Sequence, residues 1–390
     1  MSQRTQGRSI LPGVNVDDVF KDHDRYFLPR QSFQSLIDQL TLQGYGCVGP
    51  VMRDGAIIFD RLDMASQLPQ GARDRQAPGY YRLENGGGPR WFSWANGPQA
   101  LKPYLFPSRE VLWEGTVDED GGLNFKERII EPEPLAVLGV RACDLAALAI
   151  HDAHFLKGPS PDAHYARRRE QLFIVAVHCS HPASTCFCVS TGDGPAATRG
   201  YDIALAELDE GFVIDAGSDR GKLILDQLPL SKVDEAQLDQ ARRELNAAVA
   251  VQTRALPEGP LNRILFENLD HPRWDEVAER CLACGNCTSV CPTCFCASEN
   301  EVPSLDGQTS EHSREWSSCF TQGHSYISGH VIRPDIRTRY RQWLTHKLGS
   351  WIDQYGRSGC VGCGRCIAWC PVGIDLTEET AAICKDARDE

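Results

Sequence analysis

The sequence predicts an α/β N-terminal domain with a partly parallel sheet, followed by a mainly helical ferredoxin-type domain. Two observations predict this class. Apolar runs suited to buried strands alternate with helical patterns in the first two thirds of the chain. Beyond about residue 258 these runs disappear, and twelve of the seventeen cysteines lie between residues 281 and 390. We therefore expect an α/β domain over residues 1–257 and a helical domain over residues 258–390.

The first expected elements are a short helix over residues 33–43 and a hairpin over residues 47–62. The hairpin turns at Asp54-Gly55, a dipeptide that favours tight two-residue turns between strands. Residues 66–109 are rich in proline, glycine and aromatic residues and show no clear period. We expect a long loop there.

A βαβ unit follows. Residues 134–140 and 171–179 are apolar and rich in β-branched residues, as buried strands are. The segment between them has apolar residues at helical spacing, and we expect Asp144 to cap the helix. Strand, helix and strand in this order predict two parallel strands with a right-handed crossover.

The rest of the first domain is expected to be a hairpin over residues 202–217 and an amphipathic helix over residues 233–256. Pro257 ends this helix. Beyond it, the 68 residues between Cys291 and Cys360 are expected to form helices.

Composition excludes several classes of protein. The formal net charge of −13 argues against non-specific nucleic-acid binding, which requires a basic face. No apolar stretch is long enough for a membrane span, and the first residues lack the apolar core of a secretory signal. We expect a cytoplasmic protein, and in that reducing compartment seventeen cysteines indicate metal or redox chemistry rather than disulfides.

Two cysteine runs share the spacing C-x2-C-x2-C-x3-C-P, which is the signature of bacterial ferredoxins with two [4Fe–4S] clusters. In that signature three cysteines hold one cube, and the fourth reaches the other. A pair of zinc knuckles is the alternative, but zinc sites usually use two C-x2-C pairs. The crossed rule predicts one cube on Cys281, Cys284, Cys287 and Cys370, and a second on Cys360, Cys363, Cys366 and Cys291.

A third group of cysteines is expected at the carboxyl edge of the predicted sheet. One follows the first strand of the βαβ unit, one ends the second strand, and two follow in the next loop. Arg141 and the N-terminus of the helix would favour thiolates there. A third iron–sulfur cluster, a zinc site and unligated thiols all remain open for Cys143, Cys179, Cys186 and Cys188.

Several polar residues receive no role. Cys294, Cys296 and Cys319 are surplus to the ferredoxin pattern, and buried free cysteines are common. His178 and His181 flank Cys179, but a histidine that hydrogen-bonds the backbone is the simpler interpretation. The glycine-rich stretches at residues 86–88 and 192–194 lack the strand–GxGxxG–helix context of dinucleotide binding. Neither a serine-triad elbow nor a P-loop occurs in the sequence.

These motifs together resemble a known family. With VRACDLAAL, TCFCVSTGDGP, CLACGNCTSVCPTCFC, REWSSCF and GCVGCGRCIAWCPVGIDL, the chain resembles the iron–sulfur beta subunit of soluble NAD(P)-linked nickel–iron hydrogenases, or sulfhydrogenases. The A subunit of anaerobic sulfite reductase is similar. The resemblance runs from about residue 30 to the C-terminus and is vague in residues 60–130.

The resemblance implies a subunit that relays electrons and is not catalytic alone. Its partners would be a flavin subunit that handles NAD(P)H and a catalytic nickel–iron hydrogenase subunit. The alternative is the same relay beside a sirohaem sulfite reductase. An alternative of another class is a zinc-stabilised binding or scaffold protein.

Overall fold

An eight-stranded mixed sheet organises the first part of the chain. The computed structural model describes residues 16–20, 24–99 and 101–389. The four central strands run parallel, and the remaining pairs are antiparallel. The strand order is β12 (Ser231–Lys232), β1 (Tyr26–Pro29), β11 (Gly211–Ala216), β10 (Ile203–Glu207), β9 (Leu172–Val177), β8 (Leu135–Val140), β2 (Gly46–Arg53) and β3 (Ala56–Arg61).

The two hairpins and the βαβ unit expected from the sequence are present. Strands β2 and β3 pair antiparallel around Asp54-Gly55, and β10 and β11 form the second hairpin. Strands β8 and β9 pair parallel, joined by α4 (Ala142–Phe155) and α5 (Ala163–Glu170). The predicted cap is wrong, because the N-cap of α4 is Arg141, three residues earlier. Asp144 is instead buried in the first turn, where it pairs with Arg365.

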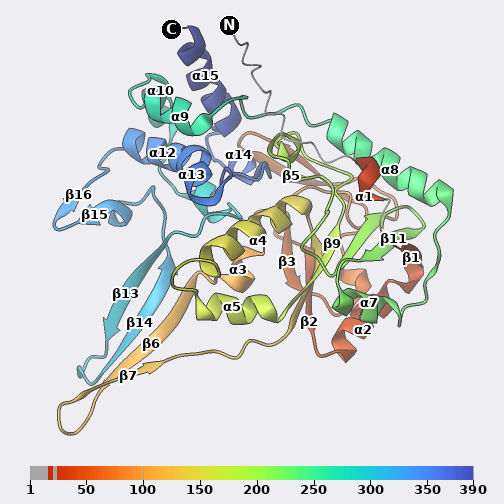
Figure 1. Cartoon of the computed structure of the whole chain (residues 1–390), viewed down its shortest axis with the longest axis horizontal. Helices are drawn as coiled ribbons and strands as arrows, with labels where there is room; N and C mark the ends of the chain where they lie inside the picture. The colour runs from red at the N-terminus through yellow and green to blue at the C-terminus, as the bar shows by residue number, and fades with distance from the viewer. Residues whose placement is uncertain (1–15, 21–23, 100, 390) are drawn as a thin grey trace, which may run out of the picture.

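Alternate residues of the central strands face two different cores. In β9, Phe173, Val175 and Val177 pack with the helices α2 (Gln34–Leu42) and α7 (Asp219–Leu225). Leu172 and Ile174 point the other way, toward α4 and α5. Figure 1 shows α4 and α5 on one face of this sheet. A sheet covered on both faces requires continuous apolar strands, which is the pattern that the sequence has there.

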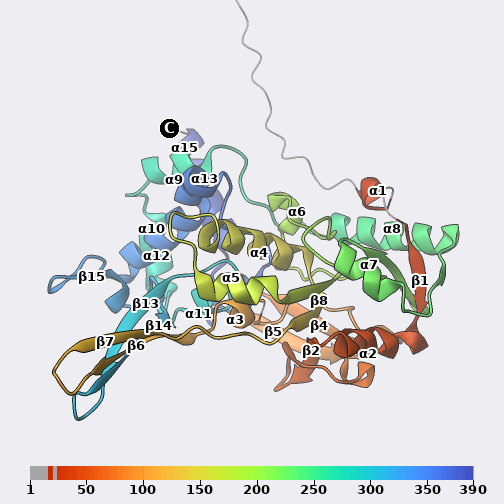
Figure 2. The same ribbon diagram turned by 60° about the horizontal axis from the view of Figure 1, so that its bottom comes forward.

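A second sheet joins distant parts of the chain. Its order is β13 (Ala297–Pro303), β14 (Thr309–Trp316), β6 (Arg109–Val117) and β7 (Leu123–Glu127). Figures 1 and 2 show it as an arm that projects from the body of the molecule. The expectation of a helical insert without strands is therefore wrong in this segment. Every residue of β13 is exposed, so it lacks the apolar alternation by which strands are recognised.

The expected long loop over residues 66–109 is also wrong in part, because it contains the hairpin β4 (Ala72–Ala77) and β5 (Tyr80–Asn85). Residues of β4 do alternate between buried and exposed positions, but two of the buried ones are Asp74 and Gln76. Their side chains hydrogen-bond each other at 2.7 Å. Buried side chains that are polar and hydrogen-bonded leave no hydrophobic pattern in the sequence by which a strand could be recognised.

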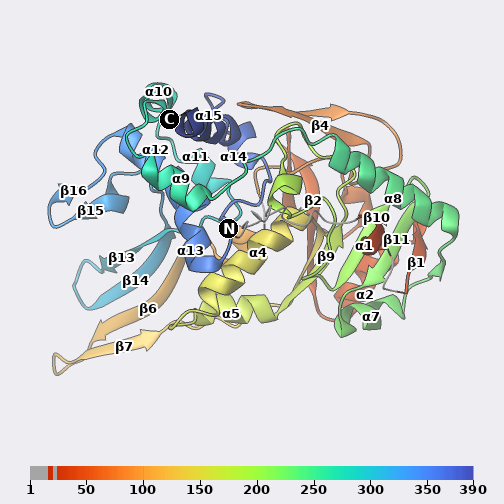
Figure 3. The same ribbon diagram turned by 45° about the horizontal axis from the view of Figure 1, so that its top comes forward.

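Short helices dominate the C-terminal part and gather at one end of the molecule (Figure 3). The predicted helix over residues 233–256 is present, slightly shorter, as α8 (Glu235–Ala250). None of the helices in the described ranges combines the length and apolar composition that a membrane span requires. The remaining elements are α1 (Val16–Val19), α3 (Lys102–Leu105), α6 (Cys188–Thr191), α9 (Leu261–Glu267), α10 (Arg273–Arg280), α11 (Asn286–Ser289), β15 (Tyr326–Ile327), β16 (His330–Val331), α12 (Ile336–Thr345), α13 (Trp351–Tyr355), α14 (Arg365–Ala368) and α15 (Leu376–Asp389).

Contacts outside the second sheet also connect the α/β part of the chain to the C-terminal part. The Arg365 guanidinium lies against α4, and Gly79 of the β4–β5 turn donates its N–H to the Ile367 carbonyl at 3.0 Å. A domain boundary near residue 257 stays a prediction. The contacts across it decide where the cysteine loops sit relative to the edge of the large sheet.

Candidate metal centre

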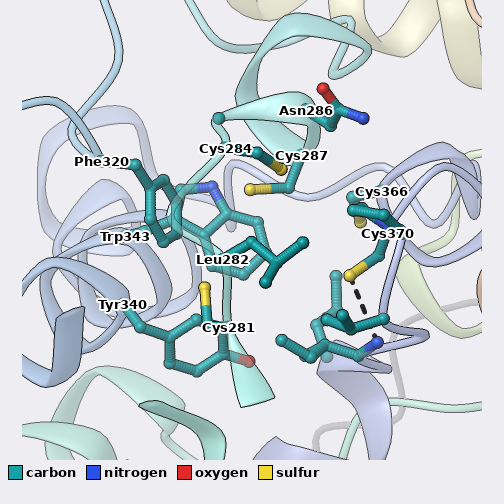
Figure 4. Close-up of a pocket in the computed structure, with 15 residues that line it drawn as sticks. Cys281, Leu282, Cys284, Asn286, Cys287, Phe320, Tyr340, Trp343, Cys366 and Cys370 are labelled. Atoms are coloured by element: carbon teal, nitrogen blue, oxygen red, sulfur yellow. Dashed lines mark hydrogen bonds between the residues drawn. The ribbon is translucent and has the colours of Figure 1, made fainter. Parts of the chain in front are cut away.

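The first of three cysteine-lined cavities lies beside α11. Figure 4 shows sulfurs from the first ferredoxin-type run and from the second facing a common space. The aromatic rings of Tyr340, Trp343 and Phe320 line the same cavity. Its cysteines are Cys281, Cys284, Cys287 and Cys370, together with Cys366.

The backbone around this cavity is shaped for thiolate ligands. Gly285 adopts φ +76° and Ala283 φ +49°, so the chain turns sharply between successive cysteines. The Ala283 N–H donates to the Cys281 sulfur at 3.4 Å, and the Ile374 N–H donates to the Cys370 sulfur at 3.3 Å. Such N–H···S hydrogen bonds stabilise negative charge on sulfur.

The second cavity lies deeper in the same part of the chain. Gly362 and Gly364 adopt φ +63° and +73°, which repeats the turn geometry of the first loop. The Gly362 N–H donates to the Cys360 sulfur at 3.5 Å. The cysteines that line this cavity are Cys291, Cys360, Cys363 and Cys366. Each cavity thus contains three cysteines of one run and the fourth cysteine of the other run, as the crossed rule predicts. The binding of a cube in each cavity stays a prediction.

A buried lysine that belongs to neither cysteine run lines the second cavity. Lys347 lies on a π-helical turn (His346–Ser350), and its ammonium donates to the Thr293 hydroxyl at 2.8 Å. Burial lowers the pKa of Lys347, but the charges of Cys291 and Cys294 more than offset this, so the pKa is raised. A buried ammonium requires nearby negative charge, which cluster thiolates supply.

The surplus cysteines lie around the same lysine. Cys294 donates a hydrogen bond to the Cys291 sulfur, which holds the pKa of Cys291 well below its usual value. A surplus cysteine therefore lies directly against a predicted cluster ligand. Cys296 is close to both lysines of the region, Lys347 and Lys102, and its pKa is raised by burial. Burial likewise raises the pKa of Cys319 to about 12.

The third cavity lies at the carboxyl edge of the large sheet, where the sequence predicts a third cysteine group. All four cysteines of that group line it: Cys143, Cys179, Cys186 and Cys188. Arg141 and Asn96 complete its polar lining, and the Asn96 amide donates to the Cys143 sulfur at 3.2 Å. Sequence reasoning did not find Asn96, because it comes from the segment expected to be a loop without structure.

The three cavities form a row. Cys366 lines both the first and the second, and Cys363 lines both the second and the third. The backbones of the second and third sites touch, because a Cβ added to Gly362 would come within 2.5 Å of Phe187 and Cys188. The Phe187 N–H also donates to the Gly362 carbonyl at 2.8 Å.

The donor sets fit iron–sulfur clusters better than single ions. No three His, Cys, Asp or Glu side chains among the described residues are arranged to hold one metal ion. A cube binds each thiolate through a different iron, so its ligands ring a space rather than converge on a point. Burial raises the pKa values of Cys143, Cys186 and Cys287 well above the usual range, so a thiolate at any of these positions would require a positive charge beside it.

The histidines beside Cys179 do not line the third cavity. His178 accepts a hydrogen bond from the Ala197 N–H at 3.1 Å through Nδ1, in keeping with the simpler interpretation. Burial lowers its pKa to about 4. His181 lies 3.9 Å from the Asp74 carboxylate.

Comparison with known proteins agrees with the cysteine pattern. Residues 280–374 match the family model of the 4Fe-4S dicluster domain. A curated relative, sulfhydrogenase 2 subunit beta of Pyrococcus furiosus, is 34% identical over 242 residues, which are 61% of this chain and 71% of the relative. No solved structure matches the chain. Because the relative is 34% identical and 71% of its length is covered, the chain belongs to the family of sulfhydrogenase beta subunits.

Proposed function

We propose that this chain is the electron-transfer iron–sulfur subunit of a cytoplasmic nickel–iron hydrogenase. It would relay electrons between a flavin subunit that binds NAD(P) and a catalytic nickel–iron subunit. The observation that carries the proposal is that two cysteine-lined cavities adjoin each other through Cys366. Electron transfer between cofactors requires such proximity, whereas two structural metal sites do not.

The cysteines in the crossed combination would hold two [4Fe–4S] clusters, which supply one-electron redox chemistry. The chain's own residues set the conditions for it. Lys347 and Lys102, each 5% exposed, place two positive charges near the second cavity. Positive charge favours the reduced, more negative state of a cluster, so these lysines would raise its potential.

The first cavity lies closest to the surface. Cys284 is exposed, Leu282 is 62% exposed and Val372 is 37% exposed. Apolar side chains beside an accessible redox site suit a small, transient interface with an electron-transfer partner. We propose this edge as one point at which electrons enter or leave.

We favour the hydrogenase complex over sulfite reduction because the curated relative is named a sulfhydrogenase subunit. The zinc scaffold is disfavoured by the repeated three-cysteine run and by cavities whose sulfurs do not converge.

Anaerobic purification of the chain with its partners tests the proposal. We expect at least about eight irons per chain, nickel in the complex, and EPR signals from reduced clusters after dithionite treatment. Iron below about four per chain, or zinc in its place, would contradict the two-cube assignment. Sirohaem absorption without nickel would instead identify a sulfite reductase.

Single substitutions separate the two cubes. Cys284→Ser changes a residue that lines only the first cavity, and Cys360→Ser changes one that lines only the second. Each should lose or convert one EPR signal and abolish electron transfer through the chain. Cys47→Ala, in β2 and away from all three cavities, is the matched control and should keep both signals.

A further inference from the structure

We propose that the third cavity binds a further iron–sulfur cluster through Cys143, Cys179, Cys186 and Cys188. The inference rests on the proposed function, because it extends the electron path of the two predicted cubes by one site. Three observations carry it: the convergence of four thiols, three of them buried, a buried guanidinium without a full set of acceptors, and direct packing against the second cavity.

The four thiols come from separate parts of the fold and meet in one buried place. Cys143 lies in the first turn of α4, which has 14 residues, and Cys179 follows β9. Cys186 and Cys188 belong to the next loop and are 5% and 7% exposed. The aligned peptide dipoles at the start of α4 favour negative charge on the Cys143 sulfur. Four thiolates brought together away from water would repel one another and lose their hydration unless a shared cationic group neutralised them.

The Arg141 side chain points to a missing anionic partner. It is 2% exposed and lines the cavity. Its Nη2 donates to the carbonyls of Phe92 and Trp94 at 2.8 and 2.9 Å. Its Nε has no acceptor among the residues that the structure describes, although it is buried. A cluster with its sulfides and thiolates would supply the negative charge that this guanidinium faces.

A second buried guanidinium lies at the boundary with the second cavity. Arg365 is 1% exposed and pairs with Asp144 at 2.8 Å. Its positive charge is close enough to the thiols of both Cys143 and Cys363 to interact with each of them. One of these cysteines belongs to each cavity, so Arg365 stabilises thiolates on both sides.

The third cavity adjoins the second, which an electron path requires and a structural zinc site does not. Cys363 lines both cavities, and a Cβ on Gly364 would come within 2.4 Å of the Thr185 backbone. The loop that carries Cys186 is thus pressed against the loop that carries Cys363. A zinc ion would also need its four ligands around one point, an arrangement that is not found among the described residues.

The third site would extend the path to a different surface. One end lies at the exposed Cys284, and the other lies at Cys179, which is partly exposed. The neighbouring His181 lines an open hollow with Arg73 and Arg90. When an electron moves along the row, one site is oxidised and its neighbour is reduced, and no bond is formed or broken.

The test is metal content and spectroscopy on the full-length chain, reconstituted anaerobically with iron and sulfide. We expect about two irons beyond eight if the third cluster is a [2Fe–2S] cluster, or about four if it is a cube. The variant Cys186→Ala/Cys188→Ala should lose that excess and one EPR component. It should keep the signals of the two predicted cubes, as should the control Cys47→Ala.

Each outcome decides between the proposals. About eight irons in both the unaltered chain and the double variant would overturn the third site and leave the two-cube function standing. Zinc retained by the unaltered chain and lost in the variant would also overturn it. Fewer than about four irons in the unaltered chain would instead contradict the function itself. If the variant fails to fold, Mössbauer spectra of the unaltered chain still give the number of clusters. Three clusters would produce one more spectral component than two.

Discussion

The Arg365 guanidinium donates to the Asp144 carboxylate at 2.8 Å, and both side chains are almost fully buried. The two residues are 221 positions apart in the sequence. Arg365 also donates to the carbonyls of Gly97 and Gln99 at 3.0 and 3.2 Å. One side chain therefore fixes the second cysteine loop against the edge of the α/β sheet, beside the third cavity.

Breaking this ion pair should be costly. Arg365→Met leaves the Asp144 carboxylate buried without its partner, and we expect a loss of about 3–5 kcal/mol in the free energy of unfolding. The double variant Asp144→Leu/Arg365→Met removes both charges and should recover part of that loss. Anaerobic denaturation in urea measures both. Equal losses in the single and double variants would show that the pair is not coupled.

Close packing at Gly362 should be intolerant of a side chain. Gly362→Ala adds a Cβ that would meet the backbone of Phe187 and Cys188 at 2.5 Å. We expect the second and third sites to separate, with loss of iron and lower stability. Gly307→Ala is a matched control, because Gly307 has a similar φ of +69° and open space around it. Similar iron contents in the two variants would contradict the predicted contact.

Lys347 should raise the potential of the second cluster. Lys347→Met removes a buried positive charge beside Cys291, so the reduced cluster loses stabilisation. We expect the midpoint potential to fall by about 60 mV or more, which corresponds to roughly 1.4 kcal/mol for one electron. Redox titration followed by EPR measures this. Lys126→Met, on the exposed strand β7, should leave the potential unchanged.

Glu110 should stabilise the arm of β6 and β14 in a pH-dependent way. Its buried carboxylate accepts from Arg314 at 2.9 Å and also pairs with Arg168 and His164. Burial raises the pKa of Glu110, but Arg168 and the other cations more than offset this and lower it below its usual value. The contribution of Glu110 to the free energy of unfolding is therefore fully present above about pH 4.3, the pKa of this carboxyl in the unfolded chain. It is lost as the pH falls through the lower pKa of the folded protein.

The variant Glu110→Gln tests this relationship. We expect it to cost about 2 kcal/mol at pH 7 and nearly the same at pH 5.5. The difference in the free energy of unfolding between the variant and the unaltered chain should shrink below about pH 4, where the carboxylate of Glu110 becomes protonated. Urea denaturation followed by tryptophan fluorescence measures it. A difference that grows on acidification would contradict the assigned direction of the pKa.

The sequence was informative where chemistry or burial dictates a regular pattern. Strands β8 and β9 are covered on both faces, so their apolar runs identify them, and the topology of a βαβ unit then brings Cys143 and Cys179 to one edge. The ferredoxin spacing likewise names the cysteines of the first two cavities, because chain geometry limits how short loops can surround a cluster.

Features that depend on tertiary contacts were not visible. Lys102 and Lys347 look like ordinary basic residues, and only the fold brings them to the cysteines of the second cavity. Strand β4 buries Asp74 and Gln76, and β13 is exposed on both faces, so neither follows an apolar period. Arg365 follows a cysteine run, but its partner Asp144 comes from the other end of the chain.

The pairing of β6 with β14 has a consequence for biosynthesis. Arg314 follows its partner Glu110 by 204 residues. At about 5–20 residues per second, a ribosome needs roughly ten to forty seconds to make the intervening polypeptide. During that interval β6 and β7 would form a hairpin with an unpaired edge, which is prone to aggregation. The nascent chain should therefore depend on chaperones, and its second cysteine run, residues 360–370, is synthesised only after the strand that closes this edge.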